Sequence, residues 1–297
     1  MKNSDRPLVS VITPSYNQAD YIEETILSVL NQSYTNIEYI IIDGASSDTT
    51  IDIIQKYSDR ISYWCSESDK GQADAINKGL RRATGDYVCW INSDDVLYPN
   101  FVETFVDCFE QNPNVDFIYG NVEQGPNIQH KSLRKGRQTD FIEMLTTLSV
   151  PIPQQATMWR RSLMEKIGYL EVEWHVLLDR EYFMRVARHA DILYVPKTVA
   201  FFRNHDTSKS VAEWHKWIPE LQRYYNRIFS DKTKDYYAYK KQAMANMDWE
   251  CFKIACTCGL YKQALSSFWS MFRLTPFKAI KRVVIYFLVR LKHIIVR

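Results

Sequence analysis

Residues 86–95 read Asp-Tyr-Val-Cys-Trp-Ile-Asn-Ser-Asp-Asp, an apolar run that leads straight into two adjacent carboxylates. The run predicts a buried strand. Because burying an unpaired charge costs several kcal/mol, we expect Asp94 and Asp95 to lie in a loop beyond the strand and outside the core. Carboxylates at that place suit a hard divalent cation, which prefers oxygen ligands and often retains substrate phosphates in its shell. The alternative is a solvated turn before a helix that starts at Pro99, with Asp95 stabilising its N-terminus.

Strand and helix patterns alternate on both sides of this stretch through the first 125 residues. Such alternation predicts an α/β fold in which a mostly parallel sheet is covered by helices on both faces. The irregular segment 123–150 is expected to be a mobile loop, 192–202 to hold two short strands, and 211–297 to be helical. The other expected strands are 8–13, 37–42, 61–65, 87–91, 117–119 and 155–159, and the expected helices are 19–32, 49–57, 72–83, 99–110, 161–167 and 178–189.

Polar residues follow four of the expected strands. They are residues 13–16, Asp43, residues 67–69 and residues 94–95. Ligands of such sheets bind at the carboxyl ends of the strands, so we expect these four strand ends to converge on one crevice.

The composition is that of an ordinary globular protein, with 46% hydrophobic and 24% charged residues in a chain of 297. This length suggests one large domain or a domain with an appendage. Six cysteines without a Cys-x-x-Cys pair indicate reduced thiols, not a disulfide framework. The polar N-terminus and the lack of a run of about 18 apolar residues predict a cytoplasmic protein, one that can attach peripherally to the inner face of the cell membrane.

The net charge of +2 conceals a basic C-terminal segment. Residues 251–297 contain nine Lys or Arg and no acid, which leaves −7 on the other 250 residues. Within 276–297 apolar residues recur at helical spacing and basic residues fall largely on another face. This pattern predicts an amphipathic tail at the surface of an anionic membrane, or else a helix docked on the protein body or at a dimer seam. Nucleic acid is not an expected partner, because the tail is more apolar than basic arms usually are, and the oligomeric state is left open.

Five segments together resemble the family 2 glycosyltransferases, which have the nucleotide-sugar-binding fold called GT-A. They occur in the family's order and spacing over roughly residues 8–210. The segments are Val9-Ser-Val-Ile-Thr-Pro-Ser-Tyr-Asn17, Glu24-Thr-Ile-Leu-Ser-Val-Leu-Asn-Gln32, Ile41-Ile-Asp-Gly-Ala-Ser-Ser-Asp48, Asp69-Lys-Gly-Gln-Ala-Asp-Ala-Ile-Asn-Lys-Gly79 and Asn92-Ser-Asp-Asp95.

The resemblance implies a GT-A domain over 1–210, with a nucleotide-binding half at about 1–122 and an acceptor half at about 123–210, followed by a helical extension over 211–297. It also implies an inverting, metal-dependent glycosyltransferase of the hexosyltransferase type. Such an enzyme moves a sugar from a UDP- or dTDP-sugar to a hydroxyl of a glycan or lipid-linked acceptor, in bacterial cell-surface polysaccharide synthesis such as that of O-antigen, capsule or exopolysaccharide. The alternative is a catalytically weak member that serves as a nucleotide-sugar-binding or scaffold subunit.

The donor pocket implied by the resemblance lies after the first two strands. Thr13, Pro14 and Tyr16 can hold a flat base with backbone groups and an aromatic ring, although the same residues suit an ordinary strand-to-helix turn. Asp43 can accept the imide N–H of uracil or thymine. A cap on the next helix is the alternative for Asp43, but Asp48 is better placed for that.

Asp74 stands in the first turn of an expected helix, where amides and the macrodipole favour an anion. The resemblance places Asp74 in the nucleotide or sugar pocket, and a simple dipole partner is the alternative. Asn77 and Lys78, further along the same helix, are interpreted as surface residues.

The resemblance assigns a Mn²⁺ or Mg²⁺ ion to the acidic turn. Asp95 is the expected main ligand, and Asp94 is shared between the ribose and the metal. Asn92 stands where many relatives have an acid, so it is expected to bind the ribose. His205 follows a strand and is expected to return to the metal, with a plain surface histidine as the alternative.

The acceptor hydroxyl must lose a proton as it attacks, so a carboxylate base is expected. We choose Asp179 as this base, with Glu181 second, although a helix N-cap has the same residue preference. Gln154, Gln155 and Trp159 match the family's acceptor side and are expected to line the sugar site, while Trp159 is equally suited to the core.

Overall fold

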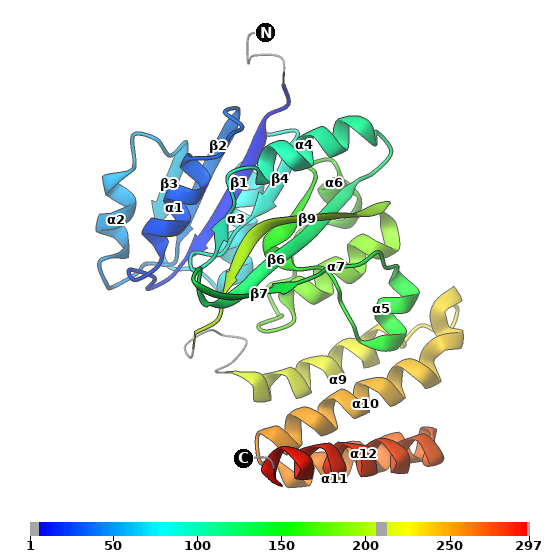
Figure 1. Ribbon diagram of the computed structural model, residues 1–297. Helices are drawn as coiled ribbons and strands as arrows, with labels where there is room; N and C mark the ends of the chain where they lie inside the picture. Colours follow the sequence, from blue (N-terminus) through cyan, green and yellow to red (C-terminus); the bar gives the residue numbers. More distant parts are fainter. Residues whose placement is uncertain (1–5, 206–212, 296–297) are drawn as a thin grey trace. The chain divides into compact units, whose positions relative to one another are not determined.

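The computed structural model describes residues 6–205 and 213–295, with side chains as far as residue 290 (Figure 1). The chain forms two compact units. The first lies within residues 1–140 and 150–208, and the second within 141–149 and 209–297. The short segment 141–149, expected in the acceptor half, therefore belongs to the second unit.

The first unit is built on one sheet in the order β3-β2-β1-β4-β8-β6-β9-β5, with β7 beside β6. The half formed by β3, β2, β1 and β4 is entirely parallel, and β8 joins it to the other half through antiparallel pairs. The strands are β1 (Val9–Ser15), β2 (Ile37–Asp43), β3 (Tyr63–Ser66), β4 (Tyr87–Trp90), β5 (Val96–Leu97), β6 (Phe117–Asn127), β7 (His130–Arg134), β8 (Thr157–Arg160) and β9 (Ile192–Arg203).

The parallel strands end together. Ser15 of β1 pairs with Asp43 of β2, and Asp43 pairs with Ser66 of β3. Trp90, the last residue of β4, pairs with Ile12 of β1. The polar segments that follow these strands therefore start from the same edge of the sheet, as predicted.

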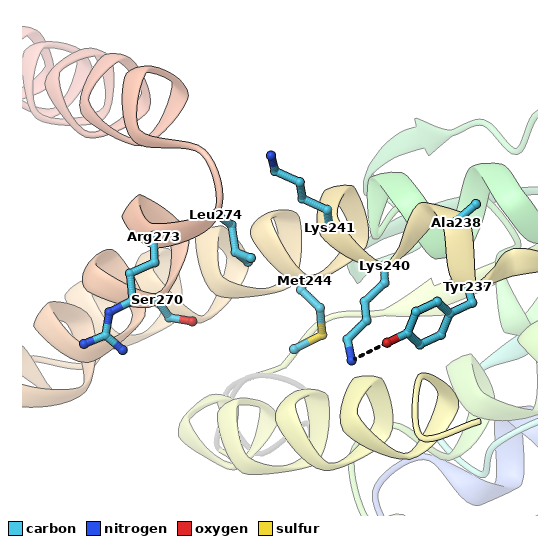
Figure 2. Close-up of a pocket in the computed structure, with 8 residues that line it drawn as sticks. All are labelled: Tyr237, Ala238, Lys240, Lys241, Met244, Ser270, Arg273 and Leu274. Carbon is cyan, nitrogen blue, oxygen red and sulfur yellow. Dashed lines mark hydrogen bonds between the residues drawn. The ribbon is translucent and has the colours of Figure 1, made fainter. Parts of the chain in front are cut away.

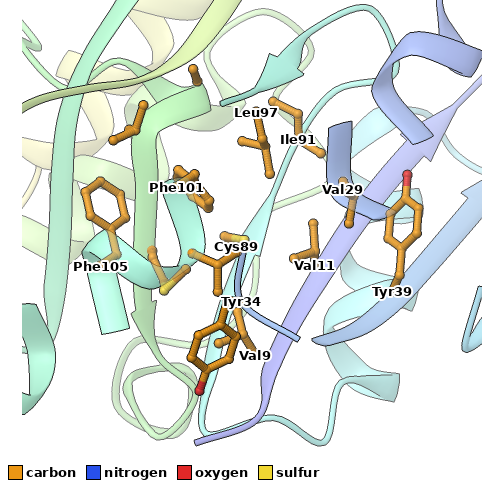
Figure 3. Packing of buried hydrophobic residues seen from close by; sticks show 14 of the residues in the cluster. Val9, Val11, Val29, Tyr34, Tyr39, Cys89, Ile91, Leu97, Phe101 and Phe105 are labelled. Atoms are coloured by element: carbon orange, nitrogen blue, oxygen red, sulfur yellow. The ribbon is translucent and has the colours of Figure 1, made fainter. Parts of the chain in front are cut away.

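Helices cover both faces of this sheet (Figure 1). Val9 and Val11 of β1 pack with α1 and α4 in one apolar cluster, part of which Figure 3 shows. Ile12 points to the other face, where α3 approaches so closely that a Cβ on Gly79 would lie 2.4 Å from the Ile12 side chain. The helices of this unit are α1 (Ile22–Leu30), α2 (Thr50–Lys56), α3 (Gln72–Arg82), α4 (Phe101–Gln111), α6 (Leu163–Ile167) and α7 (Leu178–His189), with the 3-10 turn η2 (Gln154–Ala156).

Residues 123–150 are not the loop that the sequence predicts. They contain the end of β6, the hairpin strand β7 and the helix α5. Every residue of β7 is exposed, so the strand has no apolar alternation to reveal it and is held by backbone pairing with β6.

The two short strands expected at 192–202 are one strand, β9. Pro196 stands within this strand and cannot donate to a strand ladder. In the structure Pro196 lies where the register of β9 against β6 shifts, between the pairs Tyr119–Tyr194 and Asn121–Thr198. A bulge therefore accommodates the proline within a single strand.

The second unit consists of helices, as predicted, although residues 211–212 and 296–297 of that prediction lie outside the described residues. Ala245, Met271 and Ala279 form a small core with partly buried aromatic residues. No helix in the described part of the chain is long and apolar enough to cross a membrane. The elements are α5 (Phe141–Thr147), η3 (Trp214–Lys216), α9 (Trp217–Ile228), η4 (Asp235–Tyr239), α10 (Lys240–Thr257), α11 (Tyr261–Leu274) and α12 (Pro276–Ile295).

Candidate active site

The two acids of the turn after β4 lie in different environments. The Asp94 side chain is 21% exposed, whereas Asp95 is completely buried. The expectation that both acids lie outside the core is therefore wrong for Asp95. Its carboxylate accepts hydrogen bonds from the backbone N–H of Arg203 at 2.9 Å, from Gln155 Nε2 at 2.9 Å and from Asn92 Nδ2 at 3.3 Å. These donors offset part of the cost of burial.

Asp95 does not stabilise the helix that follows. That helix, α4, begins at Phe101, and its N-cap residue is Asn100. Burial and the neighbouring Asp94 carboxylate raise the pKa of Asp95 well above its usual range, while the three donors act in the opposite direction.

Asn92 is the centre of a network of side-chain amides. Its Nδ2 donates to Gln154 Oε1 at 3.1 Å as well as to Asp95, and its Oδ1 accepts from Gln72 Nε2 at 2.9 Å. Gln154 in turn donates to the backbone carbonyl of Trp90 at 2.8 Å. A carboxylate at position 92 could not donate to either partner, so the amide is the residue type that this network needs.

His205 and Arg203 reach the acidic turn from the end of β9. The Nε2 atom of His205 lies 3.0 Å from Asp94 Oδ2. Arg203 donates from Nε to the backbone carbonyl of Asp94 at 2.9 Å and pairs with Glu24 of α1. The sequence singles out His205 but not Arg203, although Arg203 stands two residues before it and Glu24 opens one of the five family segments.

Of the three residues expected to hold the nucleotide base, two are buried and the third exposes its aromatic ring. Thr13 and Pro14 are buried, and the Thr13 hydroxyl lies 3.1 Å from that of Tyr39. Tyr16 is 61% exposed. A Cβ built on Gly44 would lie 3.5 Å from the Tyr16 ring, which places the ring beside the start of the loop after β2.

Asp43 is buried at the end of β2. Its carboxylate accepts three hydrogen bonds, from Ser46 N at 2.8 Å, Ser46 Oγ at 2.5 Å and Ser66 Oγ at 2.7 Å. Helix α2 begins only at Thr50, and Asp48 accepts the Thr50 N–H, so Asp43 does not cap that helix. A carboxylate has about four acceptor positions, which leaves one for a ligand.

Asp74 lies in the first turn of α3 and accepts the backbone N–H of Lys70 at 3.2 Å. The sequence predicts that two later residues of α3 lie at the surface, which is wrong for Asn77, whereas the Lys78 side chain is 25% exposed. Asn77 is buried and exchanges two hydrogen bonds with the backbone of Leu170, and Lys78 forms an ion pair with Glu67 at 2.8 Å. Both hold loops against α3, a role that depends on residues distant in sequence.

Asp179 and Glu181 stand in the first turn of α7. The N-cap residue is Leu177, so Asp179 is not the cap, and its carboxylate accepts the N–H of Arg180 at 2.7 Å. Burial raises the pKa of Asp179. Glu181 is buried, and Arg185 holds both of its oxygens, at 2.6 and 2.8 Å.

The three residues expected to line the sugar site, Gln154, Gln155 and Trp159, do not all lie there. The two glutamines reach the acidic turn, as described above. Trp159 is completely buried, stacks on Phe117 and meets Trp90 edge to face. Of the two interpretations of Trp159, the core residue is the one that the structure shows.

The donors at this site suit a hard or borderline cation. Carboxylate and imidazole groups are ligands that Mn²⁺ accepts, and Mg²⁺ accepts the carboxylates. Among the described residues no group of three or more His, Cys, Asp or Glu side chains is arranged to hold a metal. Asp94 and His205 therefore form a two-residue set, and a cation there would need further ligands from a substrate.

A hollow in the second unit offers no comparable chemistry. It is lined by Tyr237, Lys240, Met244, Ser270, Arg273 and neighbouring residues, none of which is an acid, histidine or cysteine. Figure 2 shows Lys240 turned toward the Tyr237 hydroxyl, at 3.4 Å, while Lys241 extends in the opposite direction. The side chains do not converge on a common point.

Comparison with known proteins identifies related chains. The family model described as "Glycosyl transferase family 2" matches residues 10–168. The chain is 53% identical over 93 residues to a putative teichuronic acid biosynthesis glycosyltransferase, TuaG of Bacillus subtilis, an alignment that covers 30% of this chain and 37% of TuaG. The chain spans little more than a third of the length of the first curated relatives that it matches.

Two solved structures have a similar fold. Staphylococcus aureus TarS 1-349 in complex with UDP-GlcNAc has a TM-score of 0.68 and 18% identity, over 92% of this chain and 82% of that one. The mannosyltransferase PcManGT from Pyrobaculum calidifontis, in complex with GDP-Man and Mn²⁺, has a TM-score of 0.63 and 17% identity, over 97% and 82%. These similarities confirm the predicted GT-A fold.

Proposed function

Because the chain belongs to glycosyl transferase family 2, we propose that it moves a sugar from a nucleotide diphosphate sugar to the hydroxyl of an acceptor. The observation that carries this proposal is the meeting of the Asp94 carboxylate and the His205 imidazole, 3.0 Å apart, beyond the carboxyl end of β4. Ligands of sheets of this kind bind at that edge. The UDP-GlcNAc and GDP-Man of the TarS and PcManGT complexes support a nucleotide sugar as donor.

The donor's base, in this proposal, stacks on the exposed ring of Tyr16 above the floor formed by Thr13 and Pro14. Asp43 receives the imide N–H of a uracil or thymine with its remaining acceptor position, which favours a UDP- or dTDP-sugar. Asp74 borders the nucleotide or sugar at the N-terminus of α3, and Asn92 borders the ribose.

Asp94 and His205 would hold a Mn²⁺ or Mg²⁺ ion, and Asp95, which follows Asp94 in the sequence, is proposed as a further ligand. Sites with so few protein ligands take the others from substrate phosphates. Such an ion, when bound, neutralises charge on the leaving diphosphate. Ligation by Asp95 would use an oxygen that already accepts hydrogen bonds, since Oδ1 accepts one of the three described above and Oδ2 accepts the other two.

Asp179 is the proposed general base. The acceptor oxygen attacks the anomeric carbon and gives its proton to the Asp179 carboxylate, while the bond from that carbon to the diphosphate oxygen breaks. Attack opposite the leaving group inverts the anomeric configuration. The raised pKa of Asp179 makes it a stronger proton acceptor than an ordinary aspartate. Glu181, the second candidate, would first have to break its ion pair with Arg185 before it could accept a proton. Asp179 is therefore the better candidate.

The acceptor, in the same proposal, is a glycan or lipid-linked intermediate of cell-surface polysaccharide synthesis. The printed name of TuaG supports this class of pathway for a relative. A lipid-linked acceptor would also explain the surface of α12, where Phe277 is 89% exposed and other large apolar residues are about half exposed. Basic residues share this helix, and no acid occurs from 251 to 297, so we propose peripheral attachment to an anionic membrane, at the inner face of the cell membrane.

A donor screen tests the proposed reaction. Release of nucleoside diphosphate would be measured from UDP-, dTDP- and GDP-sugars with Mn²⁺, with and without lipid-linked acceptors. We expect one donor to be turned over and the Asp179→Asn variant to be slower by about 10²- to 10⁴-fold. Because the pKa of Asp179 is raised, the rate should fall on acidification at a higher pH than for an ordinary aspartate. Nucleotide-sugar binding without turnover of any donor would favour a binding or scaffold subunit.

Vesicle flotation tests the membrane contact. The whole chain should float with vesicles of phosphatidylglycerol and much less with phosphatidylcholine. Phe277→Glu should reduce flotation several-fold, whereas Leu133→Glu, a matched change at an exposed residue of β7, should not. Equal flotation of the two variants would refute the contact through α12.

A further inference from the structure

Arg203 holds both acids of the turn. It is the last residue of β9 and is buried. Its backbone N–H donates to Asp95 Oδ1 and its Nε donates to the backbone carbonyl of Asp94, each at 2.9 Å. One contact fixes the carboxylate of Asp95 and the other fixes the chain at Asp94, so a shift of Arg203 would move both acids.

Helix α1 fixes Arg203 in turn. The Nη2 atom of Arg203 contacts the Glu24 carboxylate, and the guanidinium lies 5.1 Å from the centre of the Tyr21 ring. A buried guanidinium needs such a counter-charge, because an unpaired one would be costly. Thr25, next to Glu24, donates its hydroxyl to the backbone carbonyl of Asp95 at 2.7 Å. The first turn of α1 therefore supports the acidic turn both directly and through Arg203.

His205 links this arrangement to the proposed cation site. It follows Arg203 by two residues, and its Nε2 lies 3.0 Å from Asp94 Oδ2. The two side chains that would hold the ion lie on different segments, Asp94 in the turn after β4 and His205 after β9. Arg203 joins these segments through its hydrogen bond to the Asp94 carbonyl. Residues that orient metal ligands typically change metal affinity by about 10- to 100-fold when they are mutated.

We propose that Arg203, held by Glu24, is a positioning residue that sets Asp94, Asp95 and His205 for cation and diphosphate binding. This inference rests on the proposed function. Neither residue touches the substrate in this scheme. Glu24 is 46% exposed and would otherwise be taken for an ordinary acid in the first turn of a surface helix.

Two variants and one matched control test the inference. Arg203→Lys keeps the charge but loses the fork that reaches Asp94 and Glu24 together. Glu24→Gln changes a half-exposed residue and removes only the charge that faces Arg203. Arg160→Lys is the control, because Arg160 also donates to backbone carbonyls and lies over aromatic rings, but stands beside Tyr87 at the opposite end of β4.

The first measurement needs no ligand. Amide hydrogen exchange of a peptide that spans residues 91–98 should become at least about tenfold faster in Arg203→Lys, less so in Glu24→Gln, and unchanged in Arg160→Lys. The second measurement is the Mn²⁺ concentration for half-maximal turnover. It should rise by about 10-fold or more in Arg203→Lys and by a few-fold in Glu24→Gln, with kcat largely recovered at saturating Mn²⁺.

Unchanged exchange in both variants would overturn the inference, and so would a fall in kcat that no Mn²⁺ concentration restores. Equal effects in Arg160→Lys would show a general loss of stability and would also overturn it. If the unmodified chain turns over no donor, the proposed function fails, and the exchange experiment still decides whether Arg203 holds the turn.

Discussion

Asp95 in the sheet unit and Asp248 in the helical unit are both buried carboxylates, but their surroundings differ. Asp95 accepts hydrogen bonds from three residues on three separate segments. Asp248, on α10, accepts one hydrogen bond among the described residues, from the Ser270 hydroxyl of α11 at 2.5 Å. Burial raises the pKa of Asp248 to about 6.

The difference separates two consequences of burying an acid. Where several donors converge, the carboxylate is fixed in position and can organise a site. Where one hydroxyl is available, most of the desolvation cost is uncompensated and the acid destabilises its unit when charged. Both side chains are almost completely buried, and burial raises the pKa of each, so the charged form is disfavoured at both positions. What differs is the number of donors that hold the carboxylate in place.

The strongest challenge to this comparison is Asp95→Asn. The change removes the charge, so activity should fall by about 10²- to 10³-fold. It also turns an amide N–H₂ toward existing donors, and this should lower the free energy of unfolding by about 1–3 kcal/mol, more than is gained by removing a charge that burial disfavours. Initial rates with the preferred donor and urea unfolding would measure the two effects. Unaltered stability would mean that the three donors do not fix Asp95.

A milder challenge is Asn92→Asp, which adds a third carboxylate to the acidic turn. The variant would lose donation to Asp95 and Gln154 and place a second carboxylate beside a buried one. We expect a loss of about 1–3 kcal/mol in the free energy of unfolding at pH 7.5, and a smaller loss at pH 5, where the pair can retain a proton. Asn112→Asp, at the C-terminal end of α4, is the matched control and should change stability by less than about 1 kcal/mol. A variant as stable as the unmodified chain would show that the amide network is dispensable.

Local rules predict the edge of the sheet but not the contacts made across it. The strand before Asp94 and Asp95 is recognisable because its apolar run is continuous and ends in polar residues, and the strand-end rule then places the crevice. The partners of Asp95 come from Gln155 and Arg203, distant in sequence, so no local pattern links them to the acid.

The same limit explains the errors. Asn77 has a polar side chain on an amphipathic helix, and only the fold brings Leu170 beside it. Strand β7 escapes prediction because its residues are all exposed. Helix α7, in contrast, is predicted at both ends, since apolar spacing and boundary residues agree there.

The variant with the smallest expected effect on activity is Asp248→Asn, which should leave turnover unchanged. Folding raises the pKa of Asp248 from 3.8 to about 6, so between these pH values the folded chain binds more protons than the unfolded chain. Stability should therefore fall as the pH rises from about 4 to 6 and stay reduced above that range. Asparagine does not titrate, so the variant should be more stable by about 1–3 kcal/mol at pH 7.5, with the gain gone near pH 4.

Urea unfolding at pH 7.5 and at pH 4 measures this difference in stability, with unchanged turnover as a second readout. Asp231→Asn, in the same unit, is the control of opposite sign, because hydrogen bonds from Thr233 lower the pKa of Asp231. Destabilisation by Asp248→Asn at pH 7.5 would show that the Ser270 contact does for Asp248 what three donors do for Asp95, and the contrast between the two acids would be lost.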